Sequence, residues 1–449
     1  MKQVVYWIGC FMVVCTLLGC TSDNGLLIEI EKQEGNNTNS VEQKKKKNNE
    51  DETQPNNGEE YTTRTINLTD TQKSAVSKNN NFTFNFFQKL ISQENTKGKS
   101  LITSPLSATY ALGMINGGAQ GKTSEEITTM LGFDNGSKDD INKWCKTLIE
   151  EAPLVDKQVV LKLADCIISN QQITLASDFQ NCMKDYYKAE TFSKDFTDPA
   201  TVDFVNDWCN QHTEGMIKKI VSGFNPNTKL MLMNAIYFKA AWAGKFDKNN
   251  TKDEFFTMAD GNEVKVKMMK RCNGTLYGKN DVFSTIGLPY GKGDKWCMYV
   301  LLPNEGQTIE NIFSHFVKEG WESTRSKMEG KLVNVELPKF KTESEIDLND
   351  ICVALGATSL FNPATADLTL MTQNKTQLWV DLIIQKAAIE VSEEGTEASA
   401  VTYDMITSFS GGQREGKPID QFIANRPFLY IIQEASSGAI FFIGTFQGN

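Results

Sequence analysis

The chain has 449 residues, of which 40% are hydrophobic and 23% are charged, as in an ordinary globular protein. Its formal net charge of −10 argues against the basic surface that nucleic-acid binding requires, so we expect no nucleic-acid partner. The length is sufficient for one large domain with a sizeable core.

Residues 1–19 are predicted to be a signal peptide outside that domain. Lys2 supplies a short positive start, and the apolar run over residues 4–19 is too short to predict a membrane span. The run ends in residues 17–20, Leu-Leu-Gly-Cys, which resemble a bacterial lipobox. We therefore expect Cys20 to be lipidated and to anchor the protein in a bacterial cell envelope, at the outer membrane or the cell surface. A plain secretory signal or an N-terminal anchor helix is the alternative.

Residues 20–69 are predicted to be the lipidated cysteine followed by a disordered tether. They are rich in Asn, Glu, Gln, Lys and Thr, and they cannot bury enough apolar surface to become ordered. The four lysines at 44–47 have acidic neighbours, which favours a solvated linker over contact with anionic lipid head groups.

Seven cysteines follow Cys20, and neither their odd number nor their spacing fits a metal site. Most lie among apolar residues, which favours small buried side chains, with a disulfide or a reactive thiol as open alternatives. We expect no metal and no other cofactor. The seven are Cys145, Cys166, Cys182, Cys209, Cys272, Cys297 and Cys352.

The folded domain is predicted to span residues 70–449. The phenylalanine-rich stretch 82–91 is typical of a buried helix, and Pro105 lies in the first turn of a second helix. Helices dominate the first half and strands the second, which predicts an α+β fold with large, mostly antiparallel sheets. The expected strands are 229–237, 296–302, 332–337, 378–391, 428–433 and 439–446.

The sequence contains little that could support catalysis. There are only two histidines, and His212 lies in a polar helix end, where the helix dipole favours it. No GxSxG elbow, GxxxxGK[ST] phosphate loop, GxGxxG fingerprint or HExxH helix occurs. We expect no catalytic residue and no enzymatic activity.

Segments over about 370 residues resemble the serpin family in their order along the chain. They are residues 116–127, 204–208, 213–217, 234–242, 288–290, 301–303, 337–340, 355–356 and 425–428. A further segment resembles the hinge of the family's mobile reactive loop, within an exposed stretch expected over residues 393–426. The hinge consists of Glu393, Glu394, Gly395, Thr396, Glu397, Ala398, Ser399, Ala400, Val401 and Thr402.

This resemblance implies helices packed on three mostly antiparallel sheets, with a central five-stranded sheet that accepts the reactive loop as a sixth strand. It also implies an irreversible suicide inhibitor of serine proteases, with cysteine proteases as a second class of target. The target protease cleaves the loop and forms an acyl-enzyme, and the loop then inserts and distorts the attached protease. We expect a monomer.

The hinge residues themselves favour insertion. Because a strand alternates its faces, Thr396, Ala398, Ala400 and Thr402 would share one face, and all four are small. The opposite face carries Glu397 and Tyr403, and a slip of one residue would exchange the two faces. Asp404 continues the small face and argues against deep insertion, because burying an unpaired carboxylate costs several kcal/mol.

The resemblance places the scissile bond after Phe409, the fourteenth residue beyond Gly395, and before Ser410. Phenylalanine suits a protease with a deep apolar primary pocket, so we expect chymotrypsin-like or subtilisin-like targets. Cleavage elsewhere in the loop stays open, because further candidate residues flank the bond. They are Met405, Ile406, Arg414 and Lys417.

In the family, a polar shutter under the central strands and a tryptophan at the breach, where the loop first enters, control insertion. The shutter serines and asparagine map to Ser104, Ser107 and Asn234, and the breach tryptophan maps to Trp242. The family's shutter histidine falls on Gln385, which can form hydrogen bonds but cannot titrate near neutral pH. A helix cap and a satisfied core amide are the ordinary alternatives for Ser104 and Asn234.

Three other functions remain to be weighed. A non-inhibitory serpin-fold surface binding protein would keep the fold but have a bulky or proline-bearing hinge, unlike this one. A surface hydrolase would need a nucleophile and base that the sequence does not offer. A nutrient-binding surface lipoprotein is compatible with the tether, but it does not explain the hinge.

Overall fold

The computed structural model describes residues 10–19, 61–134, 136–215, 217–396 and 419–449, the first of these ranges by its backbone alone. The chain forms two compact units, Met1–Cys20 with Thr63–Asn449, and Thr21–Thr62. Only Tyr61 and Thr62 of the second unit are described, and both are exposed. The fold below is that of the first unit. None of the helices described is long and apolar enough to span a membrane.

The first helix begins at Asp70, where the sequence placed the start of the folded domain, but the folded unit begins earlier, at Thr63. Ile66, within the predicted tether, is buried in the main core, because an isolated apolar residue in a polar stretch can still pack against the domain. Thr69 caps the helix, since the Gln72 backbone N–H donates to Thr69 Oγ1 at 3.3 Å and the Gln72 side chain accepts from the Thr69 N–H at 3.0 Å. The α-helices of the described residues are α1 (Asp70–Ile91), α2 (Pro105–Gly118), α3 (Gly121–Met130), α4 (Lys138–Glu151), α5 (Ser177–Tyr187), α6 (Pro199–His212), α7 (Ile309–Glu319), α8 (Trp321–Ser326) and α9 (Asn349–Ala354).

One sheet, here called sheet A, has seven strands. Five of them follow the order β4, β3, β5, β12 and β11, and the other two, β1 and β13, lie between β5 and β12. All its pairings are antiparallel except that of β3 with β4. Its strands are β1 (Cys10–Gly19), β3 (Val159–Asn170), β4 (Glu190–Lys194), β5 (Thr228–Ala241), β11 (Phe340–Asp347), β12 (Leu378–Val391) and β13 (Gly395–Thr396).

The other sheet, sheet B, has nine strands, so the described residues form two sheets where the sequence predicted three. The reason is the long strand β7, which pairs with β6, β8 and β10 and thereby joins strands that would otherwise lie in separate sheets. Its strands are β2 (Leu101–Thr103), β6 (Lys252–Thr257), β7 (Glu263–Lys279), β8 (Phe283–Tyr290), β9 (Trp296–Pro303), β10 (Glu329–Pro338), β14 (Asp420–Ile423), β15 (Phe428–Glu434) and β16 (Ile440–Phe446).

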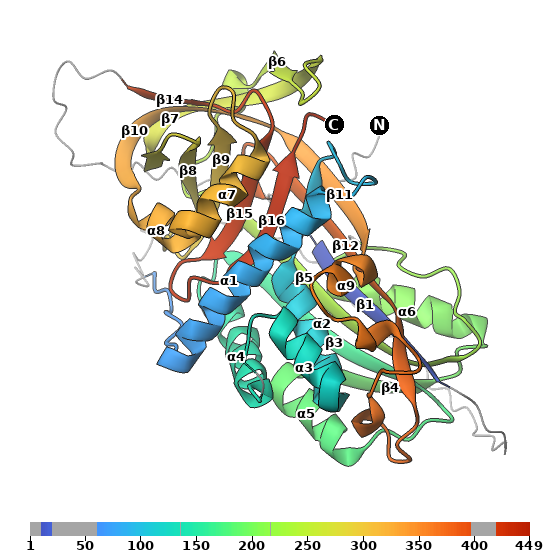
Figure 1. Cartoon of the computed structure of the whole chain (residues 1–449). Coiled ribbons are helices and arrows are strands. Elements are labelled where there is room, and N and C mark those ends of the chain that lie inside the picture. Colours follow the sequence, from blue (N-terminus) through green and yellow to red (C-terminus); the bar gives the residue numbers. More distant parts are fainter. Residues whose placement is uncertain (1–9, 20–60, 135, 216, 397–418) are drawn as a thin grey trace, which may run out of the picture. The chain divides into compact units, whose positions relative to one another are not determined.

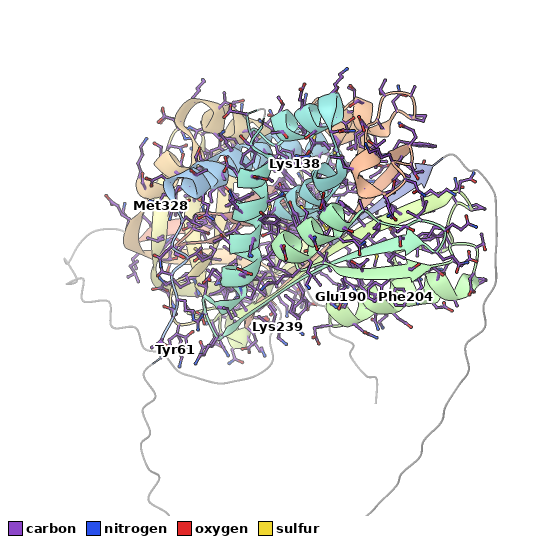
Figure 2. The ribbon with its side chains drawn as sticks, turned by 90° about the horizontal axis from the view of Figure 1, so that it is seen from below. Tyr61, Lys138, Glu190, Phe204, Lys239 and Met328 are labelled. Carbon is purple, nitrogen blue, oxygen red and sulfur yellow. The ribbon has the colours of Figure 1, made fainter. Side chains whose placement is uncertain are left out.

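Sheet A is covered on both faces. On one face α2 packs against β5, β1 and β16, so that it lies between the two sheets (Figure 1). On the other face α6 covers β3 and β5, and its Trp208 Nε1 donates to Glu190 of β4 at 2.7 Å; Figure 2 labels Glu190 and Phe204 of these two elements. The two faces explain why β5 is apolar without alternation: Leu232 joins the main core and Met233 joins the smaller core under α6.

The predicted signal peptide is the main departure from the sequence analysis. Cys10–Gly19, expected to lie outside the folded domain, forms β1 and pairs along its length with both β5 and β12. An apolar run of this length satisfies a central strand as well as a signal sequence, because both require apolar residues and no charge. Removal of residues 1–19 from the mature protein stays a prediction.

Candidate functional site

The candidate site is the space between β5 and β12, which we call the sixth-strand position. Its two neighbouring strands are bridged by β13 at one end and by β1 along the rest, and both bridging strands run antiparallel to them (Figure 1). Gly395 and Thr396 lie opposite Ala241 and Ala240, and Cys10 follows opposite Tyr237. The position predicted for the reactive loop is therefore entered by the hinge and otherwise filled by β1.

The hinge begins with two carboxylates held by lysines. Glu393 is only 4% exposed, and its carboxylate accepts hydrogen bonds from Lys339 Nζ and Thr251 Oγ1, both at 2.9 Å. Burial alone would raise the pKa of Glu393, but these hydrogen bonds outweigh it and lower the pKa. Hydrogen bonds from Lys245 and Lys248, at 2.7 and 2.9 Å, likewise lower the pKa of Glu394.

Among the hinge residues that the structure describes, Glu393 to Thr396, Gly395 has no space for a side chain. Its φ is +148°, and a Cβ there would lie 2.3 Å from the Ala240 carbonyl oxygen and 2.7 Å from Ala241 Cα. Only a residue without a side chain lets the chain turn from β12 into the sixth-strand position at this point.

Thr396 and Trp242 anchor the entrance. Thr396 is 1% exposed, and its hydroxyl lies 2.5 Å from the Tyr290 hydroxyl. Trp242 stacks on Tyr290 with ring centroids 4.4 Å apart, and its Nε1 donates to the Ser392 carbonyl at 2.8 Å. The predicted breach residue thus contacts the segment that leads into the hinge, and Thr396 points into the core as the small face of the hinge requires.

The remaining loop residues fall outside the part of the chain that the structure describes. They are Glu397, Ala398, Ser399, Ala400, Val401, Thr402, Asp404, Phe409 and Ser410. Within the stretch 393–426 that was expected to be exposed, Glu393, Gly395 and Thr396 are buried, Glu394 is half-buried, and Asp420–Ile423 forms β14, parallel to β10. Cys20 also lies outside the described residues.

The predicted shutter residues come together in one buried group, the polar cluster, which contains Thr103, Ser104, Ser107, Asp165, Asn234 and Gln385. On the β12 side, Gln385 Nε2 donates to the Ser104 carbonyl at 2.9 Å, while its oxygen accepts from the Ser104 N–H at 3.2 Å and from the Thr103 hydroxyl. Gln385 therefore acts as both donor and acceptor. On the β5 side, the Ser107 hydroxyl donates to the Asn234 side-chain oxygen.

The ordinary roles of these residues coexist with the cluster. Ser104 caps α2 by accepting from the Ser107 N–H at 3.1 Å, and its hydroxyl donates to the Phe441 carbonyl at 2.7 Å. The Asn234 amide is engaged at both of its polar atoms, because its Nδ2 donates to Asp165 at 2.7 Å and its oxygen accepts from the Ser107 hydroxyl. The cluster links α2 to strands on both sides of the sixth-strand position.

Sequence reasoning missed seven residues of this site: Thr251, Lys245 and Lys248 beside the hinge carboxylates, and Lys339, Tyr290, Thr103 and Asp165. Lys339 and Tyr290 lie in Leu-Pro-Lys-Phe and Leu-Pro-Tyr segments that pointed to the fold, but their partners are distant in sequence. Asp165 did carry a signal, since it is a lone carboxylate within the apolar strand Val159–Asn170.

The seven cysteines after Cys20 form no disulfide, and no cluster of three potential metal ligands occurs in the described ranges. Five are buried, Cys182 is half-buried and Cys272 is exposed on β7. Burial raises the pKa of the Cys297 thiol to about 12 and that of Cys352 to about 12, as expected of core side chains.

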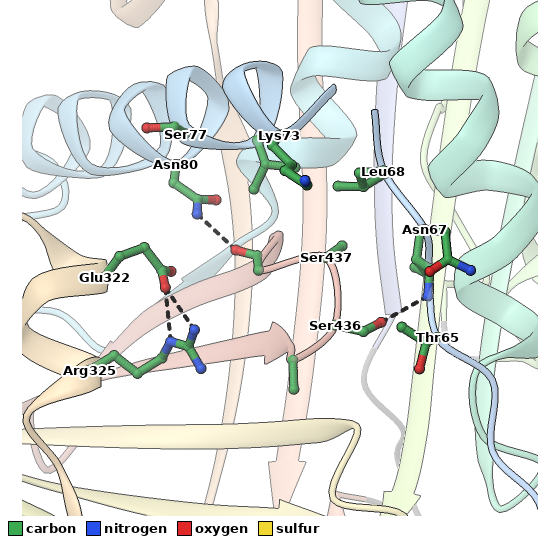
Figure 3. A pocket seen from close by; sticks show the side chains of 14 residues that line it. Thr65, Asn67, Leu68, Lys73, Ser77, Asn80, Glu322, Arg325, Ser436 and Ser437 are labelled. Atoms are coloured by element: carbon green, nitrogen blue, oxygen red, sulfur yellow. Dashed lines mark hydrogen bonds and ion pairs between the residues drawn. The ribbon is translucent and has the colours of Figure 1, made fainter. Parts of the chain in front are cut away.

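A pocket of about 490 Å³ lies between α1, α8 and the turn that joins β15 to β16 (Figure 3). Several of its polar groups are engaged by the chain: Arg325 pairs with Glu322 at 2.8 Å, and Asn80 Nδ2 donates to the Gly438 carbonyl at 2.8 Å. The Ser436 hydroxyl accepts from the Ile66 N–H at 3.0 Å. This pocket is separate from the hinge and the polar cluster.

Comparison with known proteins agrees with this geometry. A sequence profile described as "Serpin (serine protease inhibitor)" matches residues 77–447. Neuroserpin of Gallus gallus is 32% identical over 360 residues, which covers 77% of this chain and 85% of that protein. The native-state structure of the thermophilic serpin tengpin has a TM-score of 0.74 at 29% identity and covers 86% of this chain and 96% of its own. Human thyroxine-binding globulin has a TM-score of 0.73 at 24% identity over 84% and 98% of the two chains, a likeness of fold alone.

Proposed function

Because the chain belongs to the serpin family, we propose that it is an irreversible suicide inhibitor of serine proteases that traps the acyl-enzyme by inserting its reactive loop. The observation that supports this most directly is β13. Gly395 and Thr396 already pair with β5 and β12, so the first step of insertion needs no rearrangement of the sheet. Inhibitors of this type need bait and an acceptor sheet, and they need no catalytic group of their own.

The pairing of β13 supplies a register from which we extrapolate the positions of later loop residues in the inserted state. Thr396 opposes Ala240 on β5 and Val391 on β12, so every further loop residue moves one residue back along both strands. Without a bulge, this register brings Thr402 opposite Asn234 and Gln385, the row in which Val13 of β1 now lies. A small hydroxyl at Thr402 suits that row, because both neighbours are buried amides of the polar cluster.

The same register bears on the scissile bond. In an unbroken register, loop residue 408 would pair with Thr228, the first residue of β5, and Phe409 would be the first residue beyond that strand. With the bulge that β1 shows opposite Lys229, Phe409 would be the second. Cleavage after Phe409 therefore lets the loop pair along the whole length of β5, whereas cleavage after Arg414 would add five further unpaired residues as slack. Full use of the ladder supports Phe409 as the bait residue.

The test is to mix the protein with chymotrypsin-like and subtilisin-like proteases and examine the products by denaturing electrophoresis. We expect a covalent complex and a released peptide that begins at Ser410. A nicked inhibitor beside fully active protease would contradict the inhibitory function, and a peptide with another first residue would move the bait without affecting that function.

Asp404 is expected to slow the second half of insertion. In the same register it would lie between Leu232 and Ile383, both fully buried and apolar, where a carboxylate costs several kcal/mol. Slow insertion gives the protease time to hydrolyse the acyl-enzyme, so Asp404→Ala should raise the ratio of complex to cleaved inhibitor. Glu397→Ala, on the opposite face of the loop, is the control. An unchanged ratio in Asp404→Ala would remove this role.

A non-inhibitory surface binding protein is the second candidate, and β1 is the observation that favours it. A sheet already filled between β5 and β12 has no room for ten further loop residues, so a chain that keeps β1 would be cleaved without trapping its protease. The electrophoresis experiment separates the two functions directly.

We further propose that Cys20 carries a lipid anchor, that residues 1–19 are removed, and that the inhibitor acts at a bacterial outer membrane or cell surface. The support is the Leu-Leu-Gly-Cys sequence at residues 17–20. Mass spectrometry of the N-terminal peptide from membranes of an expressing bacterium should show an acylated Cys20. Cys20→Ala should leave the protein unacylated, and an unmodified wild-type N-terminus would exclude the anchor.

A further inference from the structure

Asp165 is a buried carboxyl with half of its hydrogen-bonding capacity unused. It lies on β3, directly opposite Asn234 of β5, and is 3% exposed. Its Oδ1 accepts from Asn234 Nδ2 at 2.7 Å, while its Oδ2 has no partner among the described atoms. An ionised carboxylate needs several donors, so this site satisfies the neutral acid better than the anion.

The surroundings of Asp165 offer no compensating positive charge. The titratable groups that face it are Tyr110 of α2, Cys145 of α4 and Tyr187 of α5, and Cys166 follows it on β3. All four are acids that are neutral when protonated, and no lysine, arginine or histidine of the described chain pairs with Asp165. Burial raises the pKa of Asp165 to about 7, and the hydrogen bond from Asn234 opposes that rise only in part.

Asp165 is linked to the sixth-strand position through a single side chain. Asn234 donates to Asp165 with its nitrogen and accepts from the Ser107 hydroxyl of α2 with its oxygen. The same Asn234 lies in the row that pairs with Val13 of β1, across from Gln385 of β12. A change of charge on Asp165 therefore acts on the residue that lines the entering strand.

We propose that Asp165 is a positioning residue whose ionisation loosens the polar cluster, so that the sixth-strand position exchanges its strand more readily as the pH rises through neutrality. The anion is poorly solvated while β5 is closed over α2, and parting the strands gives its free oxygen access to water. The neutral acid gains nothing from opening. This gives the cluster a titratable member in place of the histidine that Gln385 replaces. The proposal depends on the inhibitory function only in naming the reactive loop as the strand that enters.

The test is hydrogen exchange of the β5 and β12 amides between pH 6 and 8, with each rate corrected for intrinsic exchange and referred to β16 of the same molecule. In the wild type we expect protection of β5 and β12 to fall by about tenfold across this range. In Asp165→Asn, which keeps an oxygen acceptor for Asn234 but carries no charge, protection should not change with pH. Asp156→Asn, an equally buried aspartate outside the polar cluster, should behave as the wild type.

The same pH dependence in wild type and Asp165→Asn would overturn the proposal. So would a wild-type profile that is flat relative to β16, a result that needs no variant and holds even if Asp165→Asn does not fold. A second measurement compares the rates at which the wild type and Asp165→Asn form a covalent complex with chymotrypsin. At each pH the wild-type rate is divided by the rate of the variant, and we expect this ratio to rise by about tenfold from pH 6 to 8. If no complex forms at any pH, the inhibitory function fails, while the exchange measurement still decides the role of Asp165.

Discussion

At the start of the reactive loop, Gly395 lies between backbone atoms of β5 that leave no space for a side chain. Gly395→Ala would bring a Cβ to 2.3 Å from the Ala240 carbonyl oxygen at a φ that alanine disfavours. We expect β13 to separate from β5, with a lower melting temperature equivalent to about 1–3 kcal/mol and a lower yield of protease complex. Gly223→Ala is the control, because nothing lies within 4 Å of its added Cβ. Equal melting temperatures for the two variants would show that the close approach is absent.

Glu393 gives the hinge its own dependence on pH. Its folded-state pKa is lowered from the ordinary value of 4.5, so the carboxylate stabilises the fold above that value and the stabilisation is lost as the pH falls through the folded pKa. Glu393→Gln should lower stability by about 1–2 kcal/mol at pH 7 and flatten the fall in melting temperature below pH 4.5.

The matched control for this carboxylate is Glu345→Gln. Glu345 also pairs with a lysine, Lys386 at 2.9 Å, but its side chain is 61% exposed, so its loss should cost almost nothing. If Glu345→Gln and Glu393→Gln had equal effects, burial of the Glu393 pair would not be what stabilises the hinge.

Among the elements, strands whose apolar character is continuous could be predicted almost to the residue. The range 378–391 predicted from the sequence is β12, and 296–302 differs from β9 by one residue. The range 229–237 fell short of β5 at its end because Lys239 interrupts the apolar run. Local patterns therefore located the two strands that flank the site, β5 and β12, but not β3, β4 or β11 of the same sheet.

Pairings between distant elements could not be predicted in this way. The hydrogen bond from Asn234 to Asp165 and the ion pair from Lys339 to Glu393 join residues that share no local pattern. Likewise, composition cannot distinguish an apolar signal sequence from an apolar central strand, which is why β1 was unforeseen. The sequence located the shutter and hinge residues only through their resemblance to a family.

The strand β1 can be tested as an element. Val14 pairs with Met233 of β5 and Ile384 of β12, and Val14→Pro would remove a backbone donor inside this ladder. In full-length protein made in the cytoplasm, where residues 1–19 are retained, we expect Val14→Pro to form protease complex faster than the wild type. Thr62→Pro, in an exposed residue outside the strands, should have no effect, and equal rates in all three proteins would show that β1 does not hinder insertion.

For the whole molecule, the two ways of filling sheet A predict different responses to cleavage. A nick after Phe409 frees the loop to insert only if the sixth-strand position is available. In protein that lacks residues 1–19, about ten new backbone hydrogen bonds at about 0.5–1.5 kcal/mol each should raise the melting temperature strongly on cleavage. The full-length protein should show little change. A large rise in both would mean that the loop displaces β1.

The shared register of β1 and β13 also has a consequence for competition between strands. Since Cys10 lies opposite Tyr237, where the β13 register would place Ser399, both segments of the chain would use the same backbone donors and acceptors. Both are covalently attached to the sheet, so each competes at a local concentration on the order of millimolar rather than at the concentration of the protein. A free peptide copied from either segment must therefore be supplied at comparable concentration, or bind far more tightly, before it can enter the sheet.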